Sequence, residues 1–159
     1  MNYLNKMNDK EYNKQLIEKY PFLLPRNRWT GKVPADYDYS YTELDAMPEG
    51  WRKAFGEQMC QEIEEELEKY NLQNEYRISQ IKEKYGSLCW YDFGCTEKIV
   101  REIIPTYEKL STRICIKCGK PATKMTLGWI SPYCDDCCPE SEYATSIEEY
   151  THGVQHKTI

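Results

Sequence analysis

The strongest hydrophobic pattern is a stripe of large apolar side chains that repeats every four residues in the middle of the chain. This spacing predicts a long helix from about Pro48 to Tyr70 with one face in a core. Glutamate fills most of the other faces. The stripe consists of Trp51, Phe55, Met59, Ile63 and Leu67.

Two shorter segments carry the same helical period. The first runs from Asp9 to Tyr20, and Pro21 ends it. The second is expected from about Thr96 to Ser111, where Pro105 predicts a kink or a break because proline has no amide hydrogen to donate. We expect its inward side chains to be Ile99, Ile103, Tyr107 and Leu110.

Extended segments are expected at three places. Residues Tyr76–Ile81 and Leu88–Tyr91 are predicted to be the strands of a hairpin, joined by a loop of several residues around Tyr85-Gly86-Ser87. Asp36–Tyr41 alternates tyrosine with acidic residues or serine and is also predicted to be extended. The segment Pro21–Gly31 is too rich in proline for regular structure.

The cysteines give the clearest chemical signal. Cys115 and Cys118 form one Cys-x2-Cys pair, and Cys134 and Cys137 form another after fifteen intervening residues. Two such pairs at this distance are typical of a zinc site, because each pair covers one side of the ion and four thiolates complete a tetrahedron. Gly119 follows the first pair, where a tight turn favours a residue that tolerates positive φ. A rubredoxin-like iron site is the alternative with the same ligands.

A two-Cys, two-His finger is the rival assignment. It would combine the second cysteine pair with His152 and His156. It would leave Cys115 and Cys118 unused, and Gly153 disfavours a helix at the histidines. The remaining cysteines are interpreted as small apolar or free thiols; they are Cys60, Cys89, Cys95 and Cys138.

These patterns together predict an α+β fold. Residues 1–112 are expected to form a domain of helices packed on a short antiparallel β-hairpin. Residues 113–139 are expected to form a C-terminal zinc ribbon with four cysteine ligands and a strand at Thr123–Leu127. Residues 140–159 are expected to form a polar tail with one short helical segment near Ser146–Tyr150.

Composition and charge limit the function classes. The chain has 159 residues and a net charge of −5, distributed in alternating basic and acidic blocks: +4 over residues 1–35, −9 over 36–75, +5 over 76–124 and −5 over 125–159. The overall acidity disfavours non-specific binding to phosphate backbones, although a local basic face is still able to bind them. No apolar run approaches the roughly 20 residues of a membrane span. The first six residues lack the apolar stretch of a signal peptide, so we expect a cytoplasmic protein with reduced thiols and no membrane partner.

No catalytic motif stands out. Nucleophilic catalysis needs a positioned base, yet the only histidines are those of the C-terminal tail. There is no glycine-rich phosphate loop. We therefore expect a binding protein and not an enzyme.

Three groups of basic and aromatic side chains are candidate partner-binding residues. This combination suits single-stranded nucleic acid, a nucleotide or a protein partner. The groups are Arg26, Arg28 and Trp29; Arg77, Lys82, Lys84 and Trp90; and Lys117, Lys120, Lys124 and Trp129.

Three further stretches are informative: Pro21–Trp29, Ile81–Tyr91, and Cys118–Ala122 with Gly128-Trp129-Ile130 and the last cysteine pair. Together they resemble small uncharacterised proteins that phages and prophages of low-GC Gram-positive bacteria encode. The resemblance implies a phage setting, in the cytoplasm of the host cell, and a terminal zinc ribbon, and it implies no established activity. The expected role is an accessory protein that engages a host or defence-system protein, for example as an anti-defence inhibitor. A nucleic-acid-binding regulator and a protein that sequesters a small nucleotide signal are the alternatives.

Overall fold

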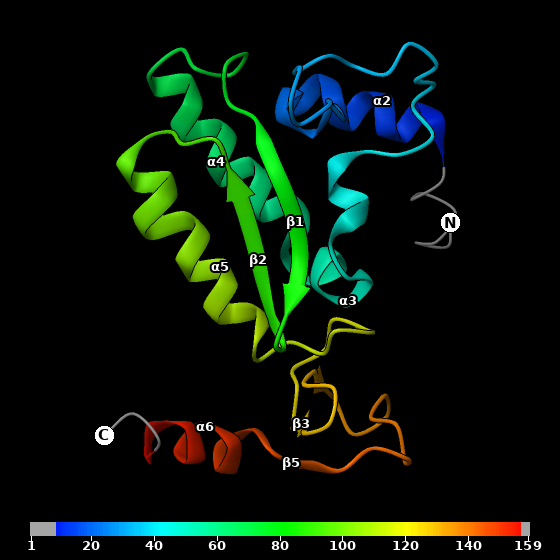
Figure 1. Cartoon of the computed structure of the whole chain (residues 1–159), viewed down its shortest axis with the longest axis vertical. Helices are drawn as coiled ribbons and strands as arrows, with labels where there is room; N and C mark the ends of the chain where they lie inside the picture. Colours follow the sequence, from blue (N-terminus) through cyan, green and yellow to red (C-terminus); the bar gives the residue numbers. More distant parts are fainter. Residues whose placement is uncertain (1–8, 157–159) are drawn as a thin grey trace.

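A computed structural model describes the main chain of residues 9–156 and the side chains of residues 9–151. The fold is α+β, as predicted: helices surround a two-stranded hairpin, and a small three-stranded sheet lies at one end (Figure 1). No described helix has the length and hydrophobicity that a membrane span needs. The main elements are α2 (Lys10–Lys19), α3 (Glu49–Trp51), α4 (Glu57–Lys69), β1 (Ile78–Lys84), β2 (Ser87–Asp92), α5 (Ile104–Ser111), β3 (Lys124–Thr126), β4 (Pro132–Tyr133), β5 (Ala144–Ser146) and α6 (Ile147–His156).

The predicted long helix is present and continuous. It consists of α3, a π-helical turn at Arg52–Gly56 and α4. Every side chain of the predicted apolar stripe is buried. The period of the sequence therefore identified the face of this helix that packs in the core.

The second long helix begins with a π-helical turn at Ile99–Ile103 and continues as α5. Pro105 lies at the join, where its missing amide hydrogen fits the irregular bonding. Leu110 was expected to face inward, and this is wrong, because its side chain is 39% exposed. The buried row continues from Tyr107 to Ser111 instead, and the Ser111 hydroxyl accepts a hydrogen bond from the backbone N–H of Leu88 (2.8 Å).

The hairpin is longer and its turn tighter than the sequence suggested. Strand β1 extends to Lys84 and pairs there with Ser87, so only Tyr85 and Gly86 form the loop. Both have positive φ, 52° and 79°, which is the signature of a type I′ turn. The prediction of a loop of several residues is therefore wrong. The two-residue turn requires a positive φ at Tyr85, a backbone conformation that tyrosine rarely adopts, so the sequence did not indicate it.

Trp90 belongs to the core and not to a binding surface. Its side chain is 3% exposed, and its indole N–H donates to the Tyr76 hydroxyl (3.0 Å), which in turn donates to Asp92 (2.8 Å). Burial, together with the nearby Asp92 carboxylate, raises the pKa of Tyr76, so the hydroxyl keeps its proton. The assignment of Trp90 to a partner-binding group is corrected on this ground.

The second sheet combines the cysteine region with the C-terminal segment. Strand β3 is central and pairs antiparallel with both β4 and β5. Residues 140–159, expected to be a polar tail with one short helical segment, supply β5 and α6, and Ile147 at the start of α6 is buried. The C-terminal segment therefore completes the sheet that starts between the two cysteine pairs.

The cysteine region contacts the main core through the start of the long helix. The backbone N–H of Gly50 donates to the carbonyl of Ile116 (2.9 Å), and the Trp51 indole donates to the carbonyl of Ile114 (2.9 Å). The approach is so close that a Cβ on Gly50 would lie 2.1 Å from the carbonyl oxygen of Cys115. Only glycine fits at this position, because the obstacle is backbone.

This contact predicts that Gly50→Ala destabilises the protein. The added methyl group would force the cysteine segment away from the helix, and overpacking of this kind typically costs about 1–3 kcal/mol. Urea unfolding followed by tryptophan fluorescence measures the change. Gly128→Ala is the matched control, since its Cβ would meet only the Glu142 carboxylate at 3.3 Å. Equal stability of the two variants would contradict the assigned contact.

Candidate metal centre and binding surfaces

Two separate segments bring four cysteine sulfurs together. The Sγ atoms of Cys115, Cys118, Cys134 and Cys137 all lie within 4.8 Å of one another, and those of Cys118 and Cys134 are 3.6 Å apart. Around a tetrahedral metal ion with metal–sulfur bonds of about 2.3 Å, the sulfurs lie about 3.8 Å apart. The four-cysteine cluster therefore has the dimensions of a metal site.

Backbone hydrogen bonds shape each pair into a tight turn. The Gly119 N–H donates to the Cys115 carbonyl (3.0 Å), and the Cys115 N–H donates to the Lys120 carbonyl (2.7 Å). Gly119 has a φ of 84°, the positive value that a tight turn after Cys118 predicts. In the second pair the Cys137 N–H donates to the Cys134 carbonyl (3.3 Å). The two turns face each other and present their thiols to a common centre.

The thiols of the cluster differ in acidity. Burial opposes ionisation of Cys115, but backbone N–H groups from both segments outweigh it and lower its pKa to about 7. Burial and hydrogen bonds shared with Cys134 and Cys118 raise the pKa of Cys137 to about 12. Four adjacent thiolates would repel one another, so a cation is the natural charge partner for the whole set.

The other cysteines lie outside this cluster. Cys60 is fully buried in the core, and burial raises the pKa of its thiol. Cys138 follows the second pair and its backbone N–H donates to the Cys134 carbonyl (3.1 Å), but its sulfur is not part of the four-cysteine group. The side chains of His152 and His156, which the rival finger assignment needs, lie outside the described residues. Because the first cysteine pair meets the second, the geometry favours the four-cysteine set.

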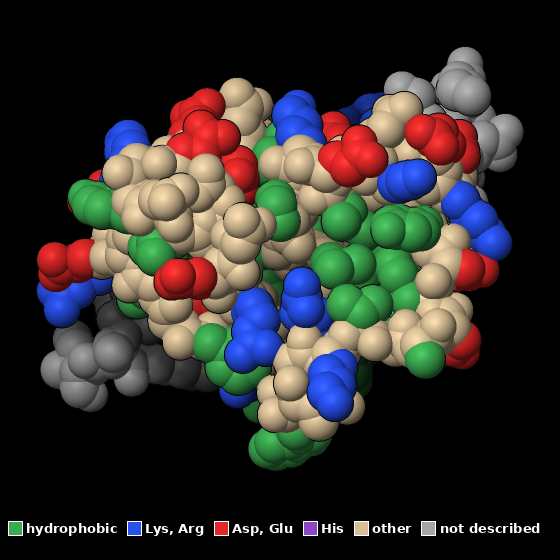
Figure 2. Space-filling model, turned by 90° about the horizontal axis from the view of Figure 1, so that it is seen from above, with side chains coloured by type: hydrophobic (Ala, Val, Ile, Leu, Met, Phe, Trp, Pro, Cys, Tyr) green, Lys and Arg blue, Asp and Glu red, His purple; other side chains and the backbone are tan. Residues whose placement is uncertain are grey.

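A second feature is an exposed surface of arginine and aromatic side chains. After α2 the chain makes a short 3-10 turn at Pro21–Leu23, and the loop that follows carries Arg26, Arg28 and Trp29. Trp29 is 89% exposed. Arg77, at the start of the hairpin, reaches the same place: it lies against Gly31 and its guanidinium stacks over the Phe93 ring at 5.4 Å. Figure 2 looks down on this end of the molecule and shows basic side chains gathered beside hydrophobic ones. We name this set the arginine–tryptophan surface: Arg26, Arg28, Trp29, Arg77 and Phe93.

The loop of this surface is held in one conformation. The Asn27 carboxamide oxygen accepts from the backbone N–H groups of Trp29 (2.8 Å) and Thr30 (2.9 Å). The Arg26 guanidinium donates to the Gly31 carbonyl (3.0 Å), and Gly31 turns the chain back with a φ of 70°. Trp29 therefore projects from a fixed turn.

The residues of the second predicted partner-binding group (Arg77, Lys82, Lys84 and Trp90) do not form one surface on the hairpin. Arg77 and Lys84 lie at opposite ends of β1, about 23 Å apart for seven extended residues. Lys82 lies over the Tyr91 ring at 5.5 Å and Lys84 over the Tyr85 ring at 5.9 Å. Together with the burial of Trp90, this arrangement joins Arg77 to the arginine–tryptophan surface and leaves Lys84 near the second sheet.

The third group surrounds the cysteine cluster unevenly. Lys117 and Lys120 are exposed on the first turn. Lys124 lies 3.9 Å from the Asp135 carboxylate, so part of its charge is compensated. Trp129 is 75% exposed. It lines a hollow together with Tyr85, which lies in the turn at the tip of the hairpin. The structure therefore connects Trp129 with the hairpin tip, a pairing that sequence separation concealed.

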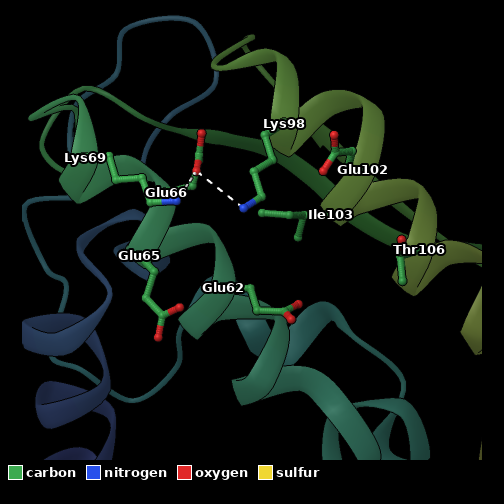
Figure 3. Close-up of a pocket in the computed structure, with 8 residues that line it drawn as sticks. All are labelled: Glu62, Glu65, Glu66, Lys69, Lys98, Glu102, Ile103 and Thr106. Carbon is green, nitrogen blue, oxygen red and sulfur yellow. Dashed lines mark hydrogen bonds and ion pairs between the residues drawn. The ribbon is translucent and has the colours of Figure 1, made fainter.

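A groove of about 280 Å³ between α4 and the second long helix is lined by several carboxylates (Figure 3). Its buried carboxylate, Glu66, lies 3.2 Å from the Lys69 ammonium and 3.9 Å from that of Lys98. The hydrogen bond to Glu66 raises the pKa of Lys69. The two lysines balance the buried charge and connect the helices, which is a structural role.

Sequence reasoning missed Phe93 and the pairing of Tyr85 with Trp129. Phe93 follows β2 directly and would have been found by extending the strand by two residues. The proximity of Tyr85 to Trp129 depends on how the second sheet meets the hairpin, and no local pattern encodes it. The chain matches no protein-family profile, no curated protein and no solved structure.

The cluster predicts that metal binding depends on Cys118. Cys118→Ser should lose most of the bound metal, because a hydroxyl replaces one of four thiolates. Mass spectrometry of the metal content per chain measures this. Cys138→Ser is the matched control, since it removes a neighbouring thiol outside the cluster, and it should retain one metal ion per chain. Full retention by Cys118→Ser, with loss on His152→Ala, would support the two-Cys, two-His assignment instead.

Proposed function

We propose that the four cysteines bind one zinc ion with a structural role. Thiolate ligands in a tetrahedral arrangement suit zinc, and four protein ligands leave no open position for a substrate. The ion would neutralise the thiolates and hold the two turns of the cysteine region together. The proposed zinc ribbon rests on the same cluster and on strands β3 and β4, which lie between the two pairs.

We further propose that the chain is a non-catalytic binding protein that engages another protein through the arginine–tryptophan surface. The observation that carries this proposal is the 89% exposure of Trp29 on a loop fixed by Asn27. A tryptophan that projects from a fixed turn exposes apolar area to water for no structural gain. Covering it with a partner would recover that hydrophobic free energy.

The composition of this surface fits a protein partner. Tryptophan and arginine dominate the energetics of protein interfaces, and a pre-ordered loop loses little entropy on binding. The guanidinium groups of Arg26, Arg28 and Arg77 form a basic rim. Glu43 lies near Arg28, and burial raises the pKa of its carboxyl against the opposing effects of a hydrogen bond from the Arg26 backbone N–H and of the Arg28 charge. The partner is therefore expected to present an apolar pocket with acidic groups around it.

The resemblance to phage-encoded proteins suggests the setting. A phage accessory protein of this kind would act in the cytoplasm of the infected cell and engage a host protein or a component of a defence system as an inhibitor. Binding of a small nucleotide signal is the weaker candidate for this surface, since its hollow among Arg26, Arg28, Arg77 and Phe93 is shallow, at about 10 Å³.

The test compares three baits on nuclease-treated host lysate: the natural sequence, Trp29→Ala and Lys120→Ala. Loss of a central interface tryptophan typically costs at least about 2 kcal/mol, or roughly thirtyfold in affinity. We expect Trp29→Ala to lose a protein that the other two baits retain, with equal metal content in all three. Titration of that purified protein then measures the ratio of the dissociation constants. Equal affinity of Trp29→Ala and the natural sequence would contradict the proposal.

A further inference from the structure

A second candidate binding surface lies between the tip of the hairpin and the second sheet, separate from the arginine–tryptophan surface. Tyr85 lines two hollows: one of about 280 Å³, shared with Lys84 and Trp129, and one of about 400 Å³, shared with Lys109 and Arg113. We name these five residues the Tyr85 cleft. Gly86 contacts the ribbon directly, since a Cβ there would lie 3.0 Å from an Ile130 side-chain carbon. The cleft therefore exists only because the cysteine region is fixed against the hairpin.

Two large aromatic side chains of this cleft are exposed although the fold does not require it. Tyr85 and Trp129 are each 75% exposed. Tyr85 also has a φ of 52°, in the left-handed region where asparagine and glycine are favoured in a type I′ turn. The backbone cost of tyrosine at this position finds little compensation in packing, since the ring is mostly exposed. A local rule broken at an exposed aromatic residue is typical of a functional position.

Three of the four charged side chains that line the two hollows are basic. Within the described residues, no ion pair involves Lys84, Lys109 or Arg113. The one carboxylate that lines the smaller hollow, Glu83, is occupied, because it accepts a hydrogen bond from the Gly86 backbone N–H (2.7 Å). The cleft therefore combines exposed aromatic faces with three available cations, in a chain whose net charge is −5.

We infer that the Tyr85 cleft binds single-stranded nucleic acid. Bases would stack on the rings of Tyr85 and Trp129, while the ammonium and guanidinium groups contact consecutive phosphates. Charge complementarity selects this occupant, since a basic rim around aromatic faces matches a chain of phosphates and bases. The two hollows on Tyr85 provide room for more than one nucleotide. The inference is independent of the partner proposed for the arginine–tryptophan surface.

The test measures fluorescence anisotropy of labelled oligo(dT) and oligo(rU), each about twelve nucleotides long, with the full zinc-loaded chain. Three phosphate contacts predict a slope of about −2.1 for log K against log salt, or about an eighteenfold loss of affinity between roughly 50 and 200 mM. Lys109→Ala with Arg113→Ala should reduce the slope to about −0.7. Free dTMP as competitor separates binding of a nucleotide from binding of a strand, since it should displace the oligonucleotide only weakly.

Two aromatic variants test the stacking. Tyr85→Asn keeps the turn, because Asn-Gly is the favoured type I′ pair, and Trp129→Ala removes the other ring. Each should weaken binding at least about fivefold. Leu127→Ala, a change at a 49% exposed ribbon position, is the control and should bind as the natural sequence does. No binding at about 50 mM salt, or binding that survives both aromatic changes and is lost on Arg26→Ala with Arg28→Ala, would overturn the inference.

Discussion

The backbone contact between Gly50 and the first cysteine turn is the constraint on which the rest of the structure depends. A carbonyl of the cysteine segment occupies the space where any other residue would place its Cβ. Gly50 lies in the first turn of the long helix, and the next residue, Trp51, is fully buried and donates its indole N–H to the carbonyl of Ile114. Gly119 completes the contact, since a Cβ there would lie 2.7 Å from the Gly50 carbonyl oxygen. Close backbone approaches at Gly50 and Gly119, together with the Trp51 indole hydrogen bond, thus fix the main core and the cysteine cluster to each other.

Two candidate binding surfaces lie at opposite ends of β1. At one end Arg77 joins the loop of Arg26, Arg28 and Trp29, which we assign to a protein partner. At the other end Tyr85 lies near Trp129, and we assign this surface to single-stranded nucleic acid. The first surface needs only the main core, because its residues come from the loop and the hairpin. The second needs the cysteine region in its place, so the proposed binding of a metal ion there would control it.

The sequence predicted what local periodicity and ligand spacing encode. The long helix, its buried face and the meeting of the cysteine pairs followed from i+4 spacing and from Cys-x2-Cys. The two-residue alternation of side chains along a strand would also have placed Leu88 and Trp90 together on one buried face of β2. Trp90 could therefore have been assigned to the core from the sequence and not to a partner-binding group. The prediction that Leu110 faces the core was wrong because hydrophobicity favours leucine over serine at a buried position. In the structure Ser111 is buried instead, and its hydroxyl accepts a hydrogen bond from the Leu88 backbone N–H. The pairing of β5 with β3 rests on three residues and long-range contact, which no local signal reveals.

Hydrogen exchange with and without added zinc tests the central claim that the four-cysteine cluster and the core form one unit. After removal of zinc by a chelator, we expect faster exchange at the Gly50 backbone N–H and the Trp51 indole N–H, both of which donate to carbonyls of the cysteine region. The amides in the middle of α4 should stay protected, since their bonds lie within the helix. Unchanged protection at Gly50 and Trp51, with exchange rising only between residues 115 and 137, would contradict the claim.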